Sequence, residues 1–431
     1  MGGIIIISCF LLLISIRVPI SISMGIATVV TMLTCGYAES LYIIPMHMAE
    51  GTQSYPLLAV PFFILTGNIM NRSGITDQIF DFANKLVGHI RGGLAQVNVV
   101  ASMIFAGISG AATADAAGLG VVEMKAMTDR GYKRDYSAAI TLASSIIGPI
   151  IPPSIGLVLI GVLSNTSIGR LFLGGFIPGI LVGLALMAMN VYYSYTREDF
   201  PQPEKRASLR EILKTFKTGL LALMAPVVIL GGLIGGFATA TESGIVAANY
   251  AFLASFFYNK PKDVIRMLPG ALYDTVRTTA LIMFIISLAT SMSWLLSFEK
   301  VPSIIASSFL EITQNKYLFL LLLNIFLLFI GAIIEGIPAL LILIPILLPV
   351  VDKFGIDRVH FGMIIHLNLL IGIGTPPMGI GLYIMTGVAK ISFEEVVRAF
   401  WPFLIPLCAV LLLITYFPWF TLFLPNLLMG N

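Results

Sequence analysis

The sequence predicts an all-α polytopic membrane protein whose two halves repeat one structural plan. Of its 431 residues, 58% are hydrophobic and 11% are charged, and the mean hydropathy is +0.97, which is far outside the range of soluble domains. Several apolar runs exceed the roughly 20 residues that a helix needs to cross a bilayer. None has the polar and apolar alternation that is typical of barrel strands. A bundle of membrane-spanning helices follows from these observations.

An internal repeat relates positions that are 224 residues apart. Its matches are mostly glycines and prolines: Gly107 with Gly331, Gly131 with Gly355, Gly148 with Gly372, and Pro152-Pro153 with Pro376-Pro377. Each Gly or Pro specifies a local backbone event, so these matches are stronger than matches between Leu and Ile. A repeat of this kind in an apolar chain is typical of secondary transporters.

The distribution of basic residues predicts the orientation of the chain. With the N-terminus outside, 20 of the 25 Lys and Arg residues fall in inside segments, including the polar linker 195–218. The loop before Arg134 then lies inside, and its repeat partner before Arg358 lies outside. The two halves are therefore predicted to form an inverted repeat, the geometric basis of alternating access. The apolar run 1–16 is expected to be an uncleaved first span.

Two apolar stretches are each interrupted by small residues and one carboxylate. The first runs from Phe105 to Gly120 and contains Asp115, and the second runs from Phe329 to Pro338 and contains Glu335. We expect each stretch to be a re-entrant hairpin, and its turn must be buried in protein or line a wet cavity. The two carboxylates could bind substrate or a cation, or cap a half-helix.

Two proline pairs predict two unwound helices. One pair lies between Ser144 and Gly156, and the other lies between Asn368 and Gly379. Adjacent prolines remove two helical N–H donors, so carbonyl groups are left free within the membrane. Carbonyl and hydroxyl oxygens suit a desolvated Na⁺, and the N-terminal ends of half-helices suit an anionic substrate group.

The remaining polar and reactive residues suggest no other chemistry. His366 stands where the first half has Leu142, and we expect it to be a hydrogen-bonded core group rather than a proton relay. The histidines have no metal-ligand spacing, the three cysteines are expected in the core, and no phosphate-binding loop is present. We therefore expect no cofactor and no direct use of ATP.

These motifs together resemble one family, the large membrane subunit of tripartite ATP-independent periplasmic (TRAP) transporters. The resemblance covers essentially the whole chain and is most specific at Phe105–Asp115, Gly148–Ser154, Ala240–Ser243 and Gly372–Gly379. It implies a Na⁺-coupled importer of organic acids in the bacterial inner membrane. It also implies two partners, a small membrane subunit and a soluble periplasmic substrate-binding protein.

The resemblance further implies an elevator-type fold like that of the ion-transporter superfamily, in which a transport domain slides against a scaffold. The expected scaffold comprises residues 1–54, 170–278 with the cytoplasmic linker 195–218, and 390–431. The expected transport domain comprises residues 55–169, with a hairpin near 95–127 and a broken helix at 136–167, and residues 279–389, with a hairpin near 317–351 and a broken helix at 360–389.

Two Na⁺ sites carry over by position from the family. One comprises Ser109, Ser144, Gly148, Ile151 and Ser154, and the other comprises Gly331, Gly372, Thr375 and Met378. Ile151 and Met378 could contribute only carbonyl oxygens. The expected substrate-binding residues are Ser154, Thr375, Glu335 and Asp115. Family members commonly have serine where this chain has Ala111, so one hydroxyl group is absent from the first hairpin.

The overall likeness is greatest to the sialic-acid branch, which makes sialic acid the expected substrate and a C4-dicarboxylate or a keto acid the alternative. Two other classes of protein are weaker interpretations. An intramembrane hydrolase using Asp115 and Glu335 would not explain the mirrored proline pairs. A channel with re-entrant loops would usually be a four-fold assembly with no need of an internal second copy.

Overall fold

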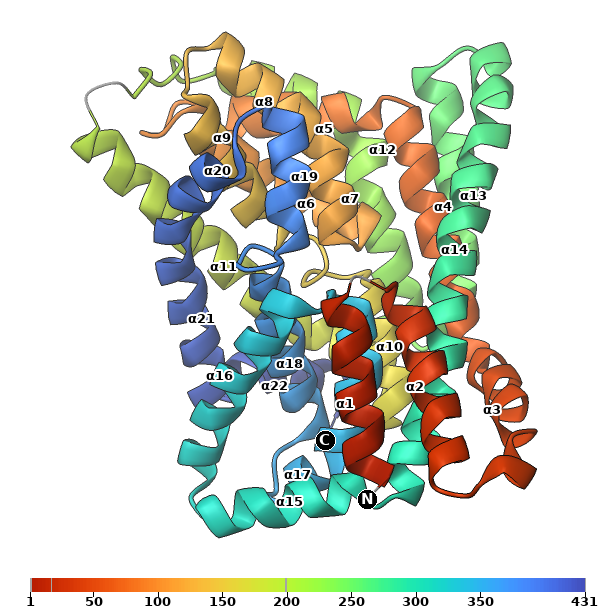
Figure 1. Ribbon diagram of the computed structural model, residues 1–431. Coiled ribbons are helices and arrows are strands. Elements are labelled where there is room, and N and C mark those ends of the chain that lie inside the picture. Colours follow the sequence, from red (N-terminus) through yellow and green to blue (C-terminus); the bar gives the residue numbers. More distant parts are fainter. Residues whose placement is uncertain (1, 17, 198–199, 431) are drawn as a thin grey trace.

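The structure, a computed structural model, describes residues 2–16, 18–197 and 200–430, without the side chains of residues 75, 76, 107–109, 114 and 310. All regular elements in this part are helical, which confirms the predicted all-α class (Figure 1). Within the same residues, six segments are long and apolar enough to cross a membrane: α11 (Ile168–Thr196), α12 (Leu209–Ile234), α14 (Pro261–Phe298), α16 (Lys316–Ile333), α17 (Gly336–Lys353) and the stretch Phe393–Tyr416.

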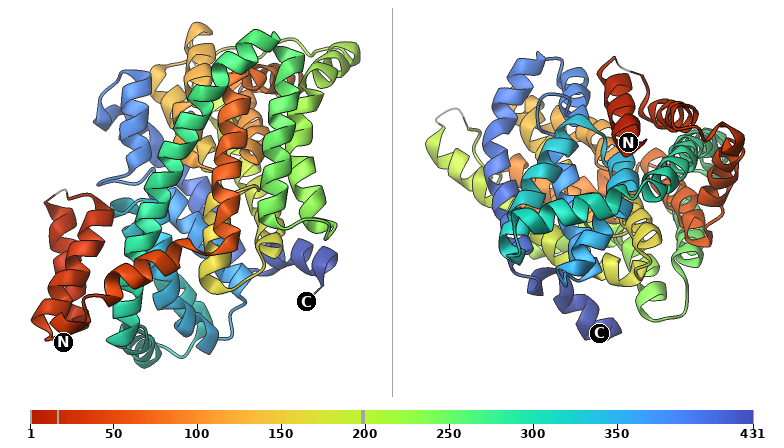
Figure 2. Two further views of the ribbon diagram at one scale, coloured as in Figure 1. Left: turned by 90° about the vertical axis from the view of Figure 1, so that its right-hand side faces the viewer. Right: turned by 60° about the horizontal axis from the view of Figure 1, so that its bottom comes forward.

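The N-terminal apolar run forms a short helix instead of the expected first span. Helix α1 (Gly2–Ser15) packs against α2 (Ile20–Thr34) at one edge of the molecule (Figure 2). Each helix is shorter than the roughly 20 residues of a full span. Pro19 is the N-cap of α2, and proline is well tolerated at the start of a helix but not inside one, so the two helices cannot continue as one through this position.

A second group of helices, built around α14, stands beside this pair. Helix α4 (Ala59–Arg72) packs against both α13 (Ala240–Tyr258) and α14, while α3 (Ile43–Thr52) packs on α14 (Figure 2). The buried face of α13 carries Gly244, Ala247 and Ala251, small residues that let membrane helices approach closely. A Cβ atom at Gly244 would lie 3.1 Å from the Cβ of Phe62 in α4. Small side chains therefore hold this group together.

The first half of the repeat contains a hairpin and an interrupted helix. Its helices are α5 (Ile75–Val87), α6 (Leu94–Ser109), α7 (Ala112–Ala117), α8 (Leu119–Asp129), α9 (Arg134–Ser145) and α10 (Ile155–Ser164). The chain reverses at Gly110, whose φ of 63° favours glycine.

The second half also contains a hairpin, formed by α16 and α17, and an interrupted helix, formed by α18 (Arg358–Gly372) and α19 (Ile380–Ala389). Its other helices are α15 (Val301–Ile312), α20 (Phe393–Phe400), α21 (Leu404–Tyr416) and α22 (Trp419–Met429). Helix α11 connects the two halves in space, since it packs against α6, α9 and α10 of the first and against α18, α21 and α22 of the second.

Matching local features recur in the two halves. Gly131 and Gly355, in the loops before α9 and α18, both have positive φ, and both proline pairs contain a cis peptide bond. Helices α8 and α9 lie in the upper part of Figure 1, whereas α17 and α18 lie in the lower part. These two helix pairs thus lie toward opposite ends of the molecule, while α10 lies in the lower part and α19 in the upper part of the same view.

Helix α14 crosses one of the expected domain boundaries. The division between residues 278 and 279 falls inside this helix, which is continuous from Pro261 to Phe298. Pro269 lies within it, nine residues before the division. Any relative movement of the two units at that point would require α14 to bend, and proline is the commonest cause of a sharp bend.

Candidate functional site

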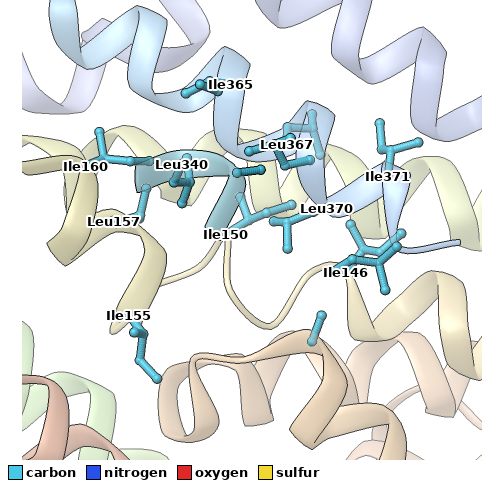
Figure 3. Close-up of a cluster of buried hydrophobic side chains, with 14 of the residues drawn as sticks. Ile146, Ile150, Ile155, Leu157, Ile160, Leu340, Ile365, Leu367, Leu370 and Ile371 are labelled. Atoms are coloured by element: carbon cyan, nitrogen blue, oxygen red, sulfur yellow. The ribbon is translucent and has the colours of Figure 1, made fainter. Parts of the chain in front are cut away.

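The first interrupted helix is sealed inside the protein. Between α9 and α10, the non-helical residues 146–154 are all buried. Ile146 and Ile150 pack among apolar side chains of α17 and α18, whereas Ile155 points toward the first hairpin, as Figure 3 shows. Ser154 begins α10 as its N-cap, and its Oγ accepts a hydrogen bond from the Leu157 N–H at 3.3 Å.

The tip of the first hairpin rests on this break. A Cβ atom at Gly110 would lie 2.8 Å from the carbonyl oxygen of Pro153 and 3.4 Å from the Cα of Ser154. Below the tip, a Cβ atom at Gly148 would overlap the buried carboxylate of Asp115. The structure therefore brings Gly148, Ser154 and Asp115 into one region, and two glycines make that approach possible.

Hydroxyl and amide groups join the outer helix of the hairpin to α9. The Oγ of Ser144 lies 2.6 Å from Oδ1 of Asn98, and Nδ2 of Asn98 donates to Thr141 Oγ1 at 2.7 Å. Ser109, the remaining expected side-chain ligand, ends α6, and its side chain lies outside the described residues. The side chain of Ile151 packs on Gly179 of α11, so only its backbone could face a cation.

The second hairpin meets the second break by direct backbone contact. A Cβ atom at Gly331 would lie 3.3 Å from the Cα of Gly372, and the Met378 N–H donates to the carbonyl of Ala332 at 3.1 Å. The Thr375 hydroxyl donates to the Ile371 carbonyl at 3.0 Å, which leaves its lone pairs available. Gly331, Gly372, Thr375 and Met378 thus converge.

Sequence reasoning missed an amide pair that repeats the first junction in the second half. Asn368 Nδ2 donates to Asn324 Oδ1 at 2.7 Å, and Asn368 is the repeat partner of Ser144. Asn324 is a lone amide in the apolar helix α16, and Asn98 shares the apolar helix α6 with Gln96, which was the signal available in the sequence. In each half, therefore, an asparagine of the outer hairpin helix is hydrogen-bonded to the broken helix.

The two breaks differ in exposure. The residues of the first are fully buried, whereas Met378 in the second is 44% exposed and Pro377 beside it is also exposed. The two halves therefore have the same elements in different surroundings.

Both hairpin tips and the first break line one cavity of about 60 Å³. Its wall includes Gly110 and Thr113 from the first tip, Pro149 and Gly156 around the break, and Glu335 from the second tip. Of the four expected substrate-binding residues, Glu335 lines this cavity, while Asp115, Ser154 and Thr375 do not. The N-terminal ends of α10 and α17 both contribute to the wall.

His366 is a cavity residue that the sequence analysis did not assign to a site. Its Nε2 donates to the carbonyl of Pro149 at 2.8 Å and lies 3.4 Å from Oγ of Ser154. It is therefore hydrogen-bonded inside the core, and it also lines the cavity with Glu335. The only sequence signal was its replacement of Leu142 in the repeat.

The donor atoms of the expected ion ligands at the two junctions are carbonyl and hydroxyl groups, and the carboxylate of Asp115 lies beside Gly148 at the first. Among the described residues, no group of three or more His, Cys, Asp or Glu side chains is placed to hold a metal ion. A desolvated monovalent cation fits such neutral oxygen donors, whereas transition metals prefer thiolate or imidazole ligands.

The chain is similar to known transport proteins. The family model for the "Tripartite ATP-independent periplasmic transporter, DctM component" matches residues 7–420. The sialic acid TRAP transporter large permease protein SiaM of Vibrio cholerae is 46% identical over 385 residues, 89% of each chain. The sialic acid TRAP transporter permease protein SiaT of Haemophilus influenzae is 39% identical over 419 residues, 97% of this chain and 67% of its own.

A solved structure shares the overall fold. The YdaH transporter of Alcanivorax borkumensis has a TM-score of 0.59 with 15% identity, and the similarity covers 89% of this chain and 90% of that one.

Proposed function

Since this chain belongs to the family of DctM components of tripartite ATP-independent periplasmic transporters, we propose that it couples Na⁺ to the import of an organic acid. The chain is accordingly a multi-pass transporter permease and not an enzyme. What carries the proposal is the cavity where Gly110, Pro149 and Glu335 bring two hairpin tips to one broken helix.

The two junctions are the proposed Na⁺ sites. Ser144, Gly148, Ile151 and Ser154 supply oxygen atoms around the first, with Ser109 as the fifth expected ligand. Gly331, Gly372, Thr375 and Met378 supply them around the second. The close backbone approaches at Gly110 and Gly331 support this assignment, because they bring carbonyls of two segments within reach of one ion.

The electrostatics of the cavity favour an anion that binds together with cations. The positive ends of α10 and α17 face the cavity and favour a carboxylate. The Glu335 carboxylate faces the same space and opposes a second negative charge. Bound Na⁺ would offset that repulsion, which is a physical reason for coupling.

Sialic acid is the proposed substrate, because the names of the two relatives described above specify it. A C4-dicarboxylate or a keto acid is the alternative. A cavity of about 60 Å³ holds about two water molecules, so the hairpin tips must separate to admit a sugar acid. We propose that this opening accompanies an elevator movement of the hairpins and broken helices past α4, α13 and α14.

The proposed assembly is tripartite and lies in the bacterial inner membrane. It includes a small membrane subunit and a periplasmic protein that delivers the substrate, as the family description and the names of relatives suggest.

Uptake of labelled sialic acid into proteoliposomes containing this chain and its small partner tests the proposal. Uptake should require both external Na⁺ and the periplasmic binding protein. Uptake of a dicarboxylate alone would replace the substrate, and Na⁺-independent flux without the binding protein would refute the coupled mechanism.

A further inference from the structure

His366 occupies a place that the repeat fills with an apolar side chain. In the first half, Leu142 of α9 packs against Gly381 of α19, and in the second half the ring of His366 in α18 packs against Gly156 of α10. The equivalent position of the first half is thus filled by an apolar side chain that makes no hydrogen bond. The polar atoms of His366 need a separate explanation.

One ring nitrogen of His366 already has a partner. The Pro149 carbonyl can only accept, so the Nε2 atom 2.8 Å away must carry the hydrogen. A neutral imidazole has a single N–H, and Nδ1 then keeps a lone pair. The contact with Pro149 thus fixes the tautomer.

The other ring nitrogen has no partner within the described part of the chain. His366 is 3% exposed, and its Nδ1 is a buried acceptor with no hydrogen bond there. Nδ1 would lie 2.9 Å from a Cβ atom at Gly156, a residue of the cavity wall, so in this closed arrangement only the glycine backbone lies against this edge of the ring. A buried acceptor without a donor is costly, and a ligand that supplies the donor removes that cost.

We propose that Nδ1 of His366 accepts a hydrogen bond from a substrate hydroxyl, so that the cavity selects hydroxylated acids over plain dicarboxylates. This inference rests on the proposed function and specifies the substrate class for the same site. A dicarboxylate offers only acceptor oxygens and leaves Nδ1 unpaired. Sites built to bond a substrate hydroxyl reject analogues that lack it.

Two substitutions separate the proposed bond between Nδ1 and the substrate from the bond between Nε2 and Pro149. His366→Gln keeps a donor near the position of Nε2 for Pro149 but has no acceptor at the position of Nδ1. His366→Asn keeps an acceptor near Nδ1 and loses the bond to Pro149. Each variant removes one of the two roles, so each controls for the other.

The experiment measures equilibrium binding of N-acetylneuraminate and of succinate to the purified complex with the small subunit, in saturating Na⁺. The periplasmic binding protein is omitted, so that the selectivity of the membrane site itself is measured. His366→Gln should weaken N-acetylneuraminate binding on the order of tenfold and leave succinate binding unchanged, whereas His366→Asn should retain the preference.

The possible failures are distinct. If wild type binds N-acetylneuraminate and His366→Gln binds it equally well, the inference is wrong and the proposed function stands. Tighter binding of succinate than of N-acetylneuraminate by wild type also overturns the inference. If wild type binds neither acid in Na⁺, the proposed function itself fails, and the inference falls with it.

Discussion

At the residue scale, the candidate cation sites depend on oxygen atoms that keep a lone pair while the residue satisfies its own hydrogen bonds. Thr375 is the clearest example, because its hydroxyl donates within its own segment to Ile371 and can still accept or bind an ion. The hydroxyl of Ser144 also donates a hydrogen bond, in this case to Oδ1 of Asn98 in another helix. Such side chains are held in position before an ion arrives.

Thr375→Val should raise the half-saturating Na⁺ concentration for uptake by about tenfold, since it removes one ligand and keeps the shape of the side chain. Substrate preference should change less. The measurement is a Na⁺ titration of sialic acid uptake in proteoliposomes.

Thr386→Val is the matched control. Thr386 makes the same kind of bond, from its hydroxyl to the Leu382 carbonyl at 2.9 Å, in the regular part of α19. Its Na⁺ titration should match wild type. An unchanged titration in Thr375→Val would remove Thr375 from the ion site.

At the element scale, each hairpin meets its broken helix where glycine leaves no side chain between the backbones. Gly110 lies against Pro153, and Gly331 lies against Gly372. The hydrogen bonds between Asn98 and Ser144 and between Asn324 and Asn368 add a polar contact between each hairpin and its broken helix. Each hairpin and its broken helix are therefore joined at two levels.

Gly372→Ala should separate the second hairpin from α18. The added Cβ would lie 2.6 Å from the carbonyl oxygen of Gly331 and would overlap its carbonyl carbon, which is backbone and cannot rotate away. We expect a loss of about 1–3 kcal/mol in stability together with loss of uptake. Thermal unfolding of the purified complex, with uptake measured alongside, gives both values.

Gly387→Ala provides the comparison for that change. Gly387 lies inside α19, and a Cβ atom added there would have no neighbouring atom within 4 Å, so alanine should be neutral or slightly stabilising. Equal behaviour of the two alanine variants would mean that the close contact at Gly372 is dispensable.

Much of this arrangement was accessible from the sequence, because its signals are local. Adjacent prolines lack N–H donors wherever they stand, so Pro152-Pro153 indicates a break in an apolar helix. Contacts between halves have no such signal: His366 and Pro149 are far apart in the chain and meet only in the fold. The same limit explains Asp115 and Glu335, chosen alike as lone carboxylates, of which only Glu335 lines the cavity.

At the scale of the whole molecule, the two halves place equivalent junctions in unequal surroundings. The first break is sealed, while Met378 in the second is 44% exposed. An elevator would exchange such environments as it moves, and the continuous helix α14 would have to bend to allow it. The accessibility of the second junction to reagents in water should therefore report an elevator movement.

Met378→Cys should report that movement, because Met378 offers only its backbone to the proposed ion site. In a background without Cys9, Cys35 and Cys408, a membrane-impermeant maleimide should label it several-fold more slowly in saturating Na⁺ and substrate. Phe237→Cys, at a position 90% exposed between α12 and α13, should react equally in all conditions. Labelling of Met378→Cys at the same rate with and without Na⁺ and substrate, with uptake intact, would argue against the movement.

The contact between Gly331 and Gly372 also has an evolutionary consequence. Main-chain oxygens are the same in every amino acid, so mutation of neighbouring side chains leaves this part of the proposed ion site unchanged, whereas a side-chain ligand such as Thr375 can be altered. Selection at such a junction acts on the absence of a side chain, and the surrounding apolar residues are free to drift. Two halves that have diverged almost everywhere can then keep the same ion chemistry, provided that the glycines remain.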